Sequence, residues 1–234
     1  MRGNNYSHSQ AAKKVKGISI RIVIVSVIFV AILLALLFIT NHFVVKGETD
    51  FDSQVINFLR NRRTAATTRI MNFFTFFGST KFLFPAYILI VLFYIFYVRN
   101  LKRSFNIAAI GLSSIGLLLL VKNIFQRHRP PNPLIAAAKG YSYPSGHSSS
   151  AFTFCGILIY ILWQSALSKL WKWAGTIFLF LFAALIAFSR VYLNVHYASD
   201  VVAGFCLAFL WLTICIGVLR RFNRSDQNVK PGRN

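Results

Sequence analysis

The residues best suited to chemistry lie in two stretches of the chain, and both are rich in basic and imidazole side chains. Several fixed cations with a single carboxylate form a binding site for a multiply charged anion. Arginine matches phosphate in particular, because its planar guanidinium donates two parallel hydrogen bonds. The two stretches therefore predict a phosphate site. The set comprises Lys122, Arg127, His128, Arg129 and His147 from the first stretch, and Arg190, His196 and Asp200 from the second.

His196 and Asp200 are the pair that could carry out nucleophilic chemistry. Their spacing of four residues predicts that they share one face of a helix. A carboxylate beside an imidazole holds the ring in one tautomer and stabilises its cation, which leaves the other ring nitrogen free to attack phosphorus. His147, which lies in the other stretch, is then a candidate for donating a proton to the leaving oxygen.

Ser145 and Gly146 come directly before an apolar segment, so we expect them at a helix N-terminus. Backbone N–H groups at such an end point towards an anion, and a glycine lets the backbone approach it closely. Both residues are therefore candidates for binding the phosphate.

Each of these residues also has an explanation that needs no function. A histidine at a helix end is often a surface or capping residue; we expect this for His8 and His42, whereas His128 fits either explanation. Asp200 could stabilise a helix dipole, and Lys122 and Arg190 could anchor the ends of membrane spans. Together, however, these explanations would have to account for the presence of all the site candidates on one face of the protein.

The elements that position these residues are predicted to be membrane-spanning helices. Six apolar segments approach or reach the roughly 17–25 residues that cross a bilayer, and none has Lys, Arg, Asp or Glu in its interior. We therefore expect an all-α fold: a six-helix transmembrane bundle in a single integral-membrane domain over residues 1–234. The segments are 22–39, 82–98, 104–121, 148–163, 173–189 and 201–219.

The connection between the first two spans carries its own pattern. Phe51, Val55, Phe58 and Leu59 recur at helical spacing, which predicts a short amphipathic helix over residues 51–59 at the membrane interface. We expect the Phe-rich run 73–77 to dip into the headgroup region before the second span.

The two motif loops, 122–147 and 190–200, follow the third and fifth spans and therefore lie on the same side of the membrane. With the N-terminus inside, 15 of the 26 Lys and Arg residues are cytoplasmic and 11 are outside. Four of those 11 belong to the candidate site, so the remaining bias is the usual inward one. We expect a multi-pass protein of the cell membrane with both termini cytoplasmic and the site facing outwards.

Composition supports a membrane protein over a soluble one. Only 13% of the residues are charged, against roughly 25% in a soluble domain. A net charge of +21 suits nucleic acid or anionic lipid. Because the basic residues flank apolar spans, we expect a bilayer and no nucleic-acid partner. The three cysteines, at 155, 206 and 215, lie in apolar segments without CxxC spacing, which argues against a disulfide framework or a thiolate metal site.

Three motifs in these stretches resemble the signature of the type 2 phosphatidic acid phosphatase superfamily. They are Lys122-x6-Arg129-Pro130, then Pro144-Ser145-Gly146-His147, then Ser189-Arg190-x5-His196-x3-Asp200. All three match in order and in the corresponding loops, and the six spans are similar to the integral-membrane lipid phosphatase branch.

The resemblance implies a role for each motif residue. His196 would be the nucleophile that forms a phosphohistidine, Asp200 would orient it, and His147 would be the general acid. The phosphoryl oxygens would be bound by Lys122, Arg129 and Arg190, with further donors from Ser145 and Gly146. No metal or cofactor is implied. The sequence agrees, because only two acidic residues, Asp200 and Asp226, follow residue 52, too few for a two-metal site.

The expected function is hydrolysis of a terminal phosphate from a lipid phosphate or diphosphate. Phosphatidylglycerophosphate, phosphatidic acid and undecaprenyl diphosphate are all substrates of this superfamily, and the motifs do not choose among them. One alternative is a phosphotransferase on the same scaffold, and another is a lipid-binding membrane protein without catalysis, which the intact His147, His196 and Asp200 argue against. The soluble vanadium haloperoxidase type is excluded by the six spans.

Overall fold

The structure is a computed structural model that describes residues 4–135 and 140–228, and the regular secondary structure in these ranges is helical. Eight α-helices lie within them, which confirms the predicted all-α class. The helices are α1 (Asn4–Ile39), α2 (Asp50–Arg60), α3 (Ala65–Phe77), α4 (Thr80–Leu92), α5 (Leu101–Phe125), α6 (Gly146–Gln164), α7 (Lys169–Tyr192) and α8 (Ala198–Asn228). Short π-helical stretches, Thr40–Val45 and Phe93–Tyr97, extend α1 and α4.

Within the part of the chain that the structure describes, six helical segments are long and apolar enough to cross a membrane, as predicted. They are Ile22–Val45, Thr80–Tyr97, Leu101–Phe125, Gly146–Gln164, Lys169–Tyr192 and Ala198–Arg221. Most run a few residues past the predicted spans, because hydropathy marks where apolar side chains end, whereas a helix ends where its backbone hydrogen bonds end. Helix α5, for example, stops at Gln126, which adopts a left-handed conformation (φ 44°) and donates its N–H to the Lys122 carbonyl. Lys122 and Arg190 therefore lie in last helical turns, although the sequence predicted them in loops.

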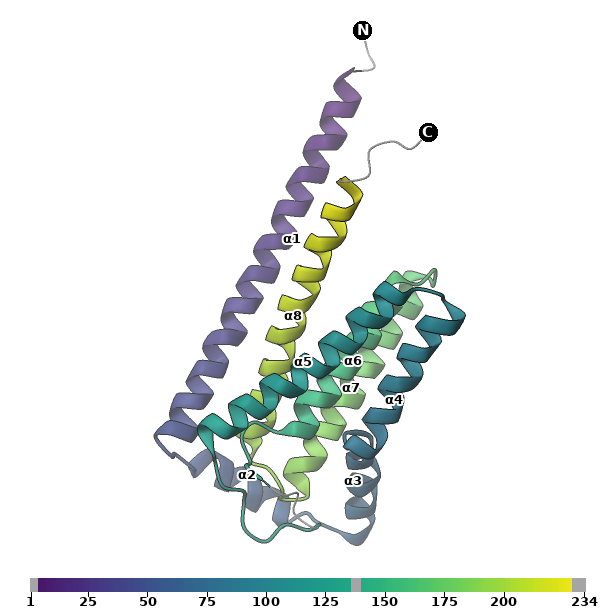
Figure 1. Cartoon of the computed structure of the whole chain (residues 1–234). Coiled ribbons are helices and arrows are strands. Elements are labelled where there is room, and N and C mark those ends of the chain that lie inside the picture. The colour runs from purple at the N-terminus through teal and green to yellow at the C-terminus, as the bar shows by residue number, and fades with distance from the viewer. Residues whose placement is uncertain (1–3, 136–139, 229–234) are drawn as a thin grey trace.

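The N-terminal end of α1 and the C-terminal end of α8 point to the same end of the molecule. Helix α2 lies at the opposite end with the segment that precedes α6 (Figure 1). Helix α6 packs against α7 and α8, and α1 packs along α8. Side chains of α1 from residue 22 to 28 are exposed, as expected for a helix surrounded by lipid.

Helix α2 confirms the short helix predicted between the first two spans. Its residues Val55 and Leu59 pack against the segment that follows α7, whereas Phe51 and Phe58 are exposed. A second short helix, α3, was not predicted as a separate element. It begins at a capping box in which Thr64 and Thr67 exchange side-chain and backbone hydrogen bonds.

The Phe-rich run 73–77 forms the last turns of α3. Phe74 and Phe77 make edge-on ring contacts with Phe182 of α7, at centroid distances of 6.2 and 5.2 Å. The run therefore holds α3 against the bundle at the end where the motifs lie.

Helices α6 and α8 come together closely at Gly204. A Cβ atom at this position would lie 2.8 Å from the Ser145 carbonyl oxygen and 3.1 Å from the Ser148 side chain. Because glycine has no Cβ, the Ser148 hydroxyl can donate to the Val201 carbonyl at 2.9 Å. This contact brings the start of α6 and the start of α8 together, and with them the second and third motifs.

Candidate active site

The motif residues gather where α5 and α7 end and where α6 and α8 begin. The Ser145 N–H donates to the Asp200 carbonyl oxygen at 3.0 Å, and the Ser142 hydroxyl donates to the Asp200 carboxylate. Ser142, Ser145 and Asp200 are buried. The two motif regions therefore meet through direct hydrogen bonds. They lie at the end of the molecule opposite the C-terminal end of α8 (Figure 1).

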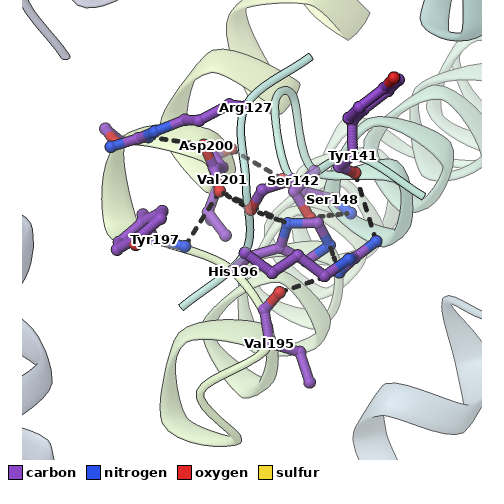
Figure 2. Close-up of polar contacts among 12 residues, drawn as sticks. Arg127, Tyr141, Ser142, Ser148, Val195, His196, Tyr197, Asp200 and Val201 are labelled. Atoms are coloured by element: carbon purple, nitrogen blue, oxygen red, sulfur yellow. Dashed lines mark hydrogen bonds and ion pairs between the residues drawn. The ribbon is translucent and has the colours of Figure 1, made fainter. Parts of the chain in front are cut away.

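His196 and Asp200 contact each other, but not on one helix face as their spacing predicted. Helix α8 begins at Ala198, and His196 lies in the turn before it. Its Nδ1 lies 3.5 Å from Asp200 Oδ2 (Figure 2). The Tyr197 N–H donates to the same oxygen at 3.0 Å, so the turn closes around the carboxylate and brings the ring back to it.

The surroundings of His196 favour one tautomer of a neutral imidazole. Nδ1 faces two acceptors, Asp200 Oδ2 and, at 3.3 Å, the Ser142 hydroxyl oxygen, so this nitrogen carries the proton. Nε2 then holds a lone pair, and Arg129 Nη1 lies 3.1 Å from it. Burial lowers the pKa of His196 to about 4; Asp200 opposes this shift, and the charges of Arg129 and Arg190 add to it. A neutral imidazole whose lone pair faces cations is suited to attack an anion bound by those cations.

Two of the predicted phosphate-binding cations are held by backbone carbonyl groups. Lys122 Nζ donates to the Tyr141 carbonyl at 2.7 Å. Arg129 donates from Nε to the Gly140 carbonyl at 3.0 Å and from Nη1 to the Val195 carbonyl at 2.9 Å. Neither side chain has a carboxylate partner in these contacts, so each keeps a positive charge that an anion can balance.

Arg190 is the third predicted cation, and it is the most deeply buried, with 2% of its surface exposed. Its Nη1 donates to Thr75 Oγ1 at 2.5 Å, and its Nε is buried without a hydrogen-bond partner among the described residues. A buried guanidinium with an unsatisfied donor is unfavourable by itself, and an anion would remove that deficit. Thr75 was missed by sequence reasoning, because nothing in its type or spacing separates it from other threonines.

His147 lies in the first turn of α6 and is half-buried. It interacts electrostatically with His196, Lys122, Arg129 and Arg190, so it belongs to the same cluster. A Cβ atom at Gly78, between α3 and α4, would lie 3.0 Å from the His147 ring and 2.6 Å from Ile186. The absence of that Cβ lets the chain pass directly beside the imidazole.

Ser145 and Gly146 lie at the N-terminus of α6, as expected. Ser145 is the capping residue, and its hydroxyl oxygen accepts the Ser148 N–H at 3.4 Å. Its own N–H is used by Asp200, so the donor that Ser145 retains is the hydroxyl. Gly146 begins the helix beside the Lys122 side chain, whose Cε would lie 3.9 Å from a Cβ at this glycine.

Arg127 and His128 do not join the phosphate-facing cations. His128 is exposed. Arg127 donates to two buried carboxylates, at 2.7 Å to Asp200 Oδ1 and at 2.9 Å to Asp52 Oδ2. Asp52 and Ser142 were missed as site residues. The only sequence signal for Asp52 was the rarity of acidic residues, five in the whole chain.

A cavity of about 500 Å³ adjoins the site, and Gly146 and His147 are among the residues that line it. Its walls are mainly apolar and come mostly from α4 and α5. The main wall residues are Leu83, Phe84, Tyr87, Ile115, Leu118 and Leu119. A polar cluster at one end of an apolar cavity is suited to a molecule that carries a charged head on an apolar tail. In the described part of the chain, no three His, Cys, Asp or Glu side chains gather in a way that could hold a metal ion.

Residues 103–224 match the PAP2 superfamily, and this range includes every site residue predicted from the sequence. Phosphatidylglycerophosphatase B of Bacillus subtilis (strain 168) is 30% identical over 164 residues, which cover 68% of this chain and 78% of the relative. Undecaprenyl-diphosphatase of Sulfolobus acidocaldarius is 28% identical over 186 residues, which cover 75% of this chain and 84% of the relative.

Two solved structures resemble the fold of this chain. The crystal structure of a transmembrane PAP2-type phosphatidylglycerolphosphate phosphatase from Bacillus subtilis has a TM-score of 0.75 at 25% identity. The match covers 88% of this chain and 98% of that chain. The crystal structure of Aquifex aeolicus LpxE has a TM-score of 0.55 at 26% identity, and the match covers 70% of this chain and 93% of that chain.

The surroundings of His196 predict its titration. With a pKa of about 4, below the ordinary 6.5, the imidazole is neutral at neutral pH and takes up a proton only as the pH falls through about 4. In ¹⁵N NMR spectra of histidine-labelled protein in detergent, we expect its ring nitrogens to keep their neutral shifts from pH 8 down to about 5. The signal is assigned by its loss in His196→Asn. A midpoint at 6.5 or above would contradict this environment.

Proposed function

Since this chain belongs to the PAP2 superfamily of membrane lipid phosphatases, we propose that it hydrolyses the terminal phosphate of a lipid phosphate or lipid diphosphate through a phosphohistidine on His196. The observation that supports this most directly is the placement of the His196 ring, with the Asp200 carboxylate at Nδ1 and the Arg129 guanidinium at Nε2. That arrangement presents a nucleophilic nitrogen to the place where cations gather.

In the first step, His196 Nε2 attacks phosphorus while the bond from phosphorus to the lipid oxygen breaks. His147 donates a proton to that oxygen, so the lipid leaves as an alcohol, or as a monophosphate when the substrate is a diphosphate. The attacking ring becomes cationic, and the Asp200 carboxylate beside Nδ1 stabilises that charge. The incoming phosphate dianion likewise stabilises the proton on His147, which otherwise has only cations around it.

In the second step, water attacks the phosphohistidine. The now neutral His147 takes a proton from the water, the phosphorus–nitrogen bond breaks, and inorganic phosphate is released. Throughout both steps, Lys122, Arg129 and Arg190 balance the charge on the phosphoryl oxygens. Three fixed cations supply the electrostatic stabilisation that metal ions provide in other phosphoryl-transfer sites.

The apolar cavity supports a lipid substrate over a soluble phosphate ester. His147, where the leaving oxygen is expected, is one of its lining residues, and its wall of α4 and α5 side chains suits an acyl or isoprenoid tail. The names of the relatives indicate the candidates, phosphatidylglycerophosphate and undecaprenyl diphosphate. Phosphatidic acid has the same chemistry at its terminal phosphate.

Phosphate release from these three lipids by the purified protein in detergent, with and without EDTA, tests the proposed reaction. We expect release from at least one of them and the same rate after chelation, because side-chain cations supply the charge. Vanadate is expected to inhibit, since its five-coordinate adduct resembles the phosphoryl-transfer state. Activity lost to EDTA and restored by a divalent cation would contradict the proposal, and product formation that requires an added acceptor alcohol would indicate a phosphotransferase.

We expect substitutions of the two histidines to affect activity in different ways. His196→Ala removes the nucleophile, so we expect a loss of at least about 10³-fold on every substrate. His147→Ala removes the acid of the first step, so in single-turnover assays, which exclude the second step, we expect release of the leaving group to fall about 10²–10⁴-fold with a lipid phosphate and much less with 4-nitrophenyl phosphate, whose leaving group needs no proton. Retained activity in a folded His196→Ala protein would rule out the nucleophile. Equal losses on both substrates would rule out the acid.

We also propose that the site faces the outside of the cell membrane and receives lipid from the outer leaflet. The excess of Lys and Arg on the side of the termini supports this orientation. Leu134 is exposed in the motif loop before α6, and Ser168 lies between α6 and α7. Since α6 crosses the membrane once between them, the two residues lie on opposite sides of the membrane. In intact cells, Leu134→Cys is expected to react with a membrane-impermeant thiol reagent and Ser168→Cys is not. The reverse pattern would invert the topology and change the leaflet that supplies the substrate.

A further inference from the structure

Asp52 is an unexpected residue on the docked side of an amphipathic helix. It lies in the first turn of α2, and its exposed fraction is zero. Further along the helix, Val55 and Leu59 pack against the apolar residues Val191, Tyr192, Leu193 and Val195. Helix α2 is therefore docked on the segment that carries His196, with the Asp52 carboxylate on the docked side.

Both oxygens of Asp52 are bound by residues next to the catalytic pair. Oδ1 accepts the Ser199 N–H at 2.9 Å, and Oδ2 accepts the Ser199 hydroxyl at 2.5 Å and Arg127 Nη2 at 2.9 Å. Ser199 lies in the first turn of α8, directly before Asp200. A carboxylate at this end of a helix also interacts favourably with the helix dipole. Asp52 therefore fixes the turn on which Asp200 is carried.

Arg127 connects the two buried carboxylates. Its Nη1 donates to Asp200 Oδ1 and to the Ser199 hydroxyl oxygen, each at 2.7 Å. The guanidinium also lies over the Tyr197 ring, 4.2 Å from its centroid. Burial alone would lower the pKa of Arg127, but Asp200 and Asp52 raise it above its ordinary value. Because a guanidinium is planar and rigid, holding one nitrogen on Asp52 sets the direction of the other towards Asp200.

The two oxygens of the Asp200 carboxylate have different hydrogen-bond partners. Oδ1 takes Arg127, whereas Oδ2 takes the Ser142 hydroxyl and the Tyr197 N–H and faces His196 Nδ1. We propose that Asp52 is a positioning residue for phosphoryl transfer: through Arg127 and Ser199 it fixes the orientation of Asp200, and Asp200 in turn orients the His196 ring. The proposal rests on the catalytic roles of His196 and Asp200 proposed above.

Asp52→Asn tests this role, because it removes the charge and one acceptor without changing the size of the side chain. With 4-nitrophenyl phosphate, we expect kcat to fall about 10–100-fold, since a small misalignment of the nucleophile is enough for such a loss. KM and the inhibition constant of inorganic phosphate should stay within about 3-fold of wild type, because Lys122, Arg129 and Arg190 are untouched.

The matched control is Asp50→Asn on the same helix. Asp50 is exposed, two residues from Asp52, and its substitution makes the same change in net charge. We expect wild-type kcat for this variant. An Asp52→Asn protein with wild-type kcat would overturn the positioning role. So would one in which phosphate binding and kcat fall together, since that is the result of a general structural defect.

Ser199→Ala keeps the proposal testable if Asp52→Asn does not fold. It removes one hydrogen bond to Asp52 and one from Arg127, so we expect kcat to fall about 3–10-fold with unchanged phosphate inhibition. An unchanged kcat in Ser199→Ala would also count against the proposal. If the wild-type protein releases no phosphate, the proposed function itself fails, which is distinct from an active wild type with an unimpaired Asp52→Asn variant.

Discussion

The arrangement of the site depends on one buried carboxylate, that of Asp200. An anion without contact with water must be surrounded by donors, and here the donors come from separate parts of the chain. Arg127 and Ser142 reach Asp200 from the segment before α6, and the Tyr197 N–H and the His196 ring come from the turn before α8. Satisfying this single charge therefore brings the two motif regions into one place and fixes the His196 ring beside it.

The cations around the site have the opposite requirement. Lys122, Arg129 and Arg190 are bound to neutral carbonyl or hydroxyl groups, and none of the three forms a direct ion pair with a carboxylate among the described residues. In surroundings of low polarity, such an excess of positive charge is stabilised by a multiply charged anion. The protein thus separates two groups of charges: Asp200, Asp52 and Arg127 form an ionic network that organises the site, and Lys122, Arg129 and Arg190 form the group that we propose binds phosphate.

The sequence predicted what depends on local composition. The six spans and the amphipathic helix followed from apolar runs and helical spacing, and α2 lies where residues 51–59 placed it. The motif residues were recognised by type and spacing. In contrast, Asp52 and Arg127 are 75 positions apart, and Arg190 and Thr75 are 115 apart. Such pairs are brought together only by packing of α2 and α3 on α7 and α8, for which a single sequence carries no signal. The contact of His196 with Asp200 also depends on a turn rather than on helical periodicity.

Under the proposed lipid phosphatase function, the apolar cavity lined by α4 and α5 determines how the reaction rate depends on the surroundings. A substrate whose tail occupies this cavity is drawn from the plane of the bilayer, so the relevant concentration is two-dimensional. Turnover then follows the mole fraction of the lipid phosphate in the membrane, not its amount per volume of solution. Added inert lipid or detergent slows the reaction by surface dilution even when the bulk concentration of substrate is constant. In a cell, the reaction rate would therefore depend on the mole fraction of the lipid phosphate in the leaflet that supplies the substrate.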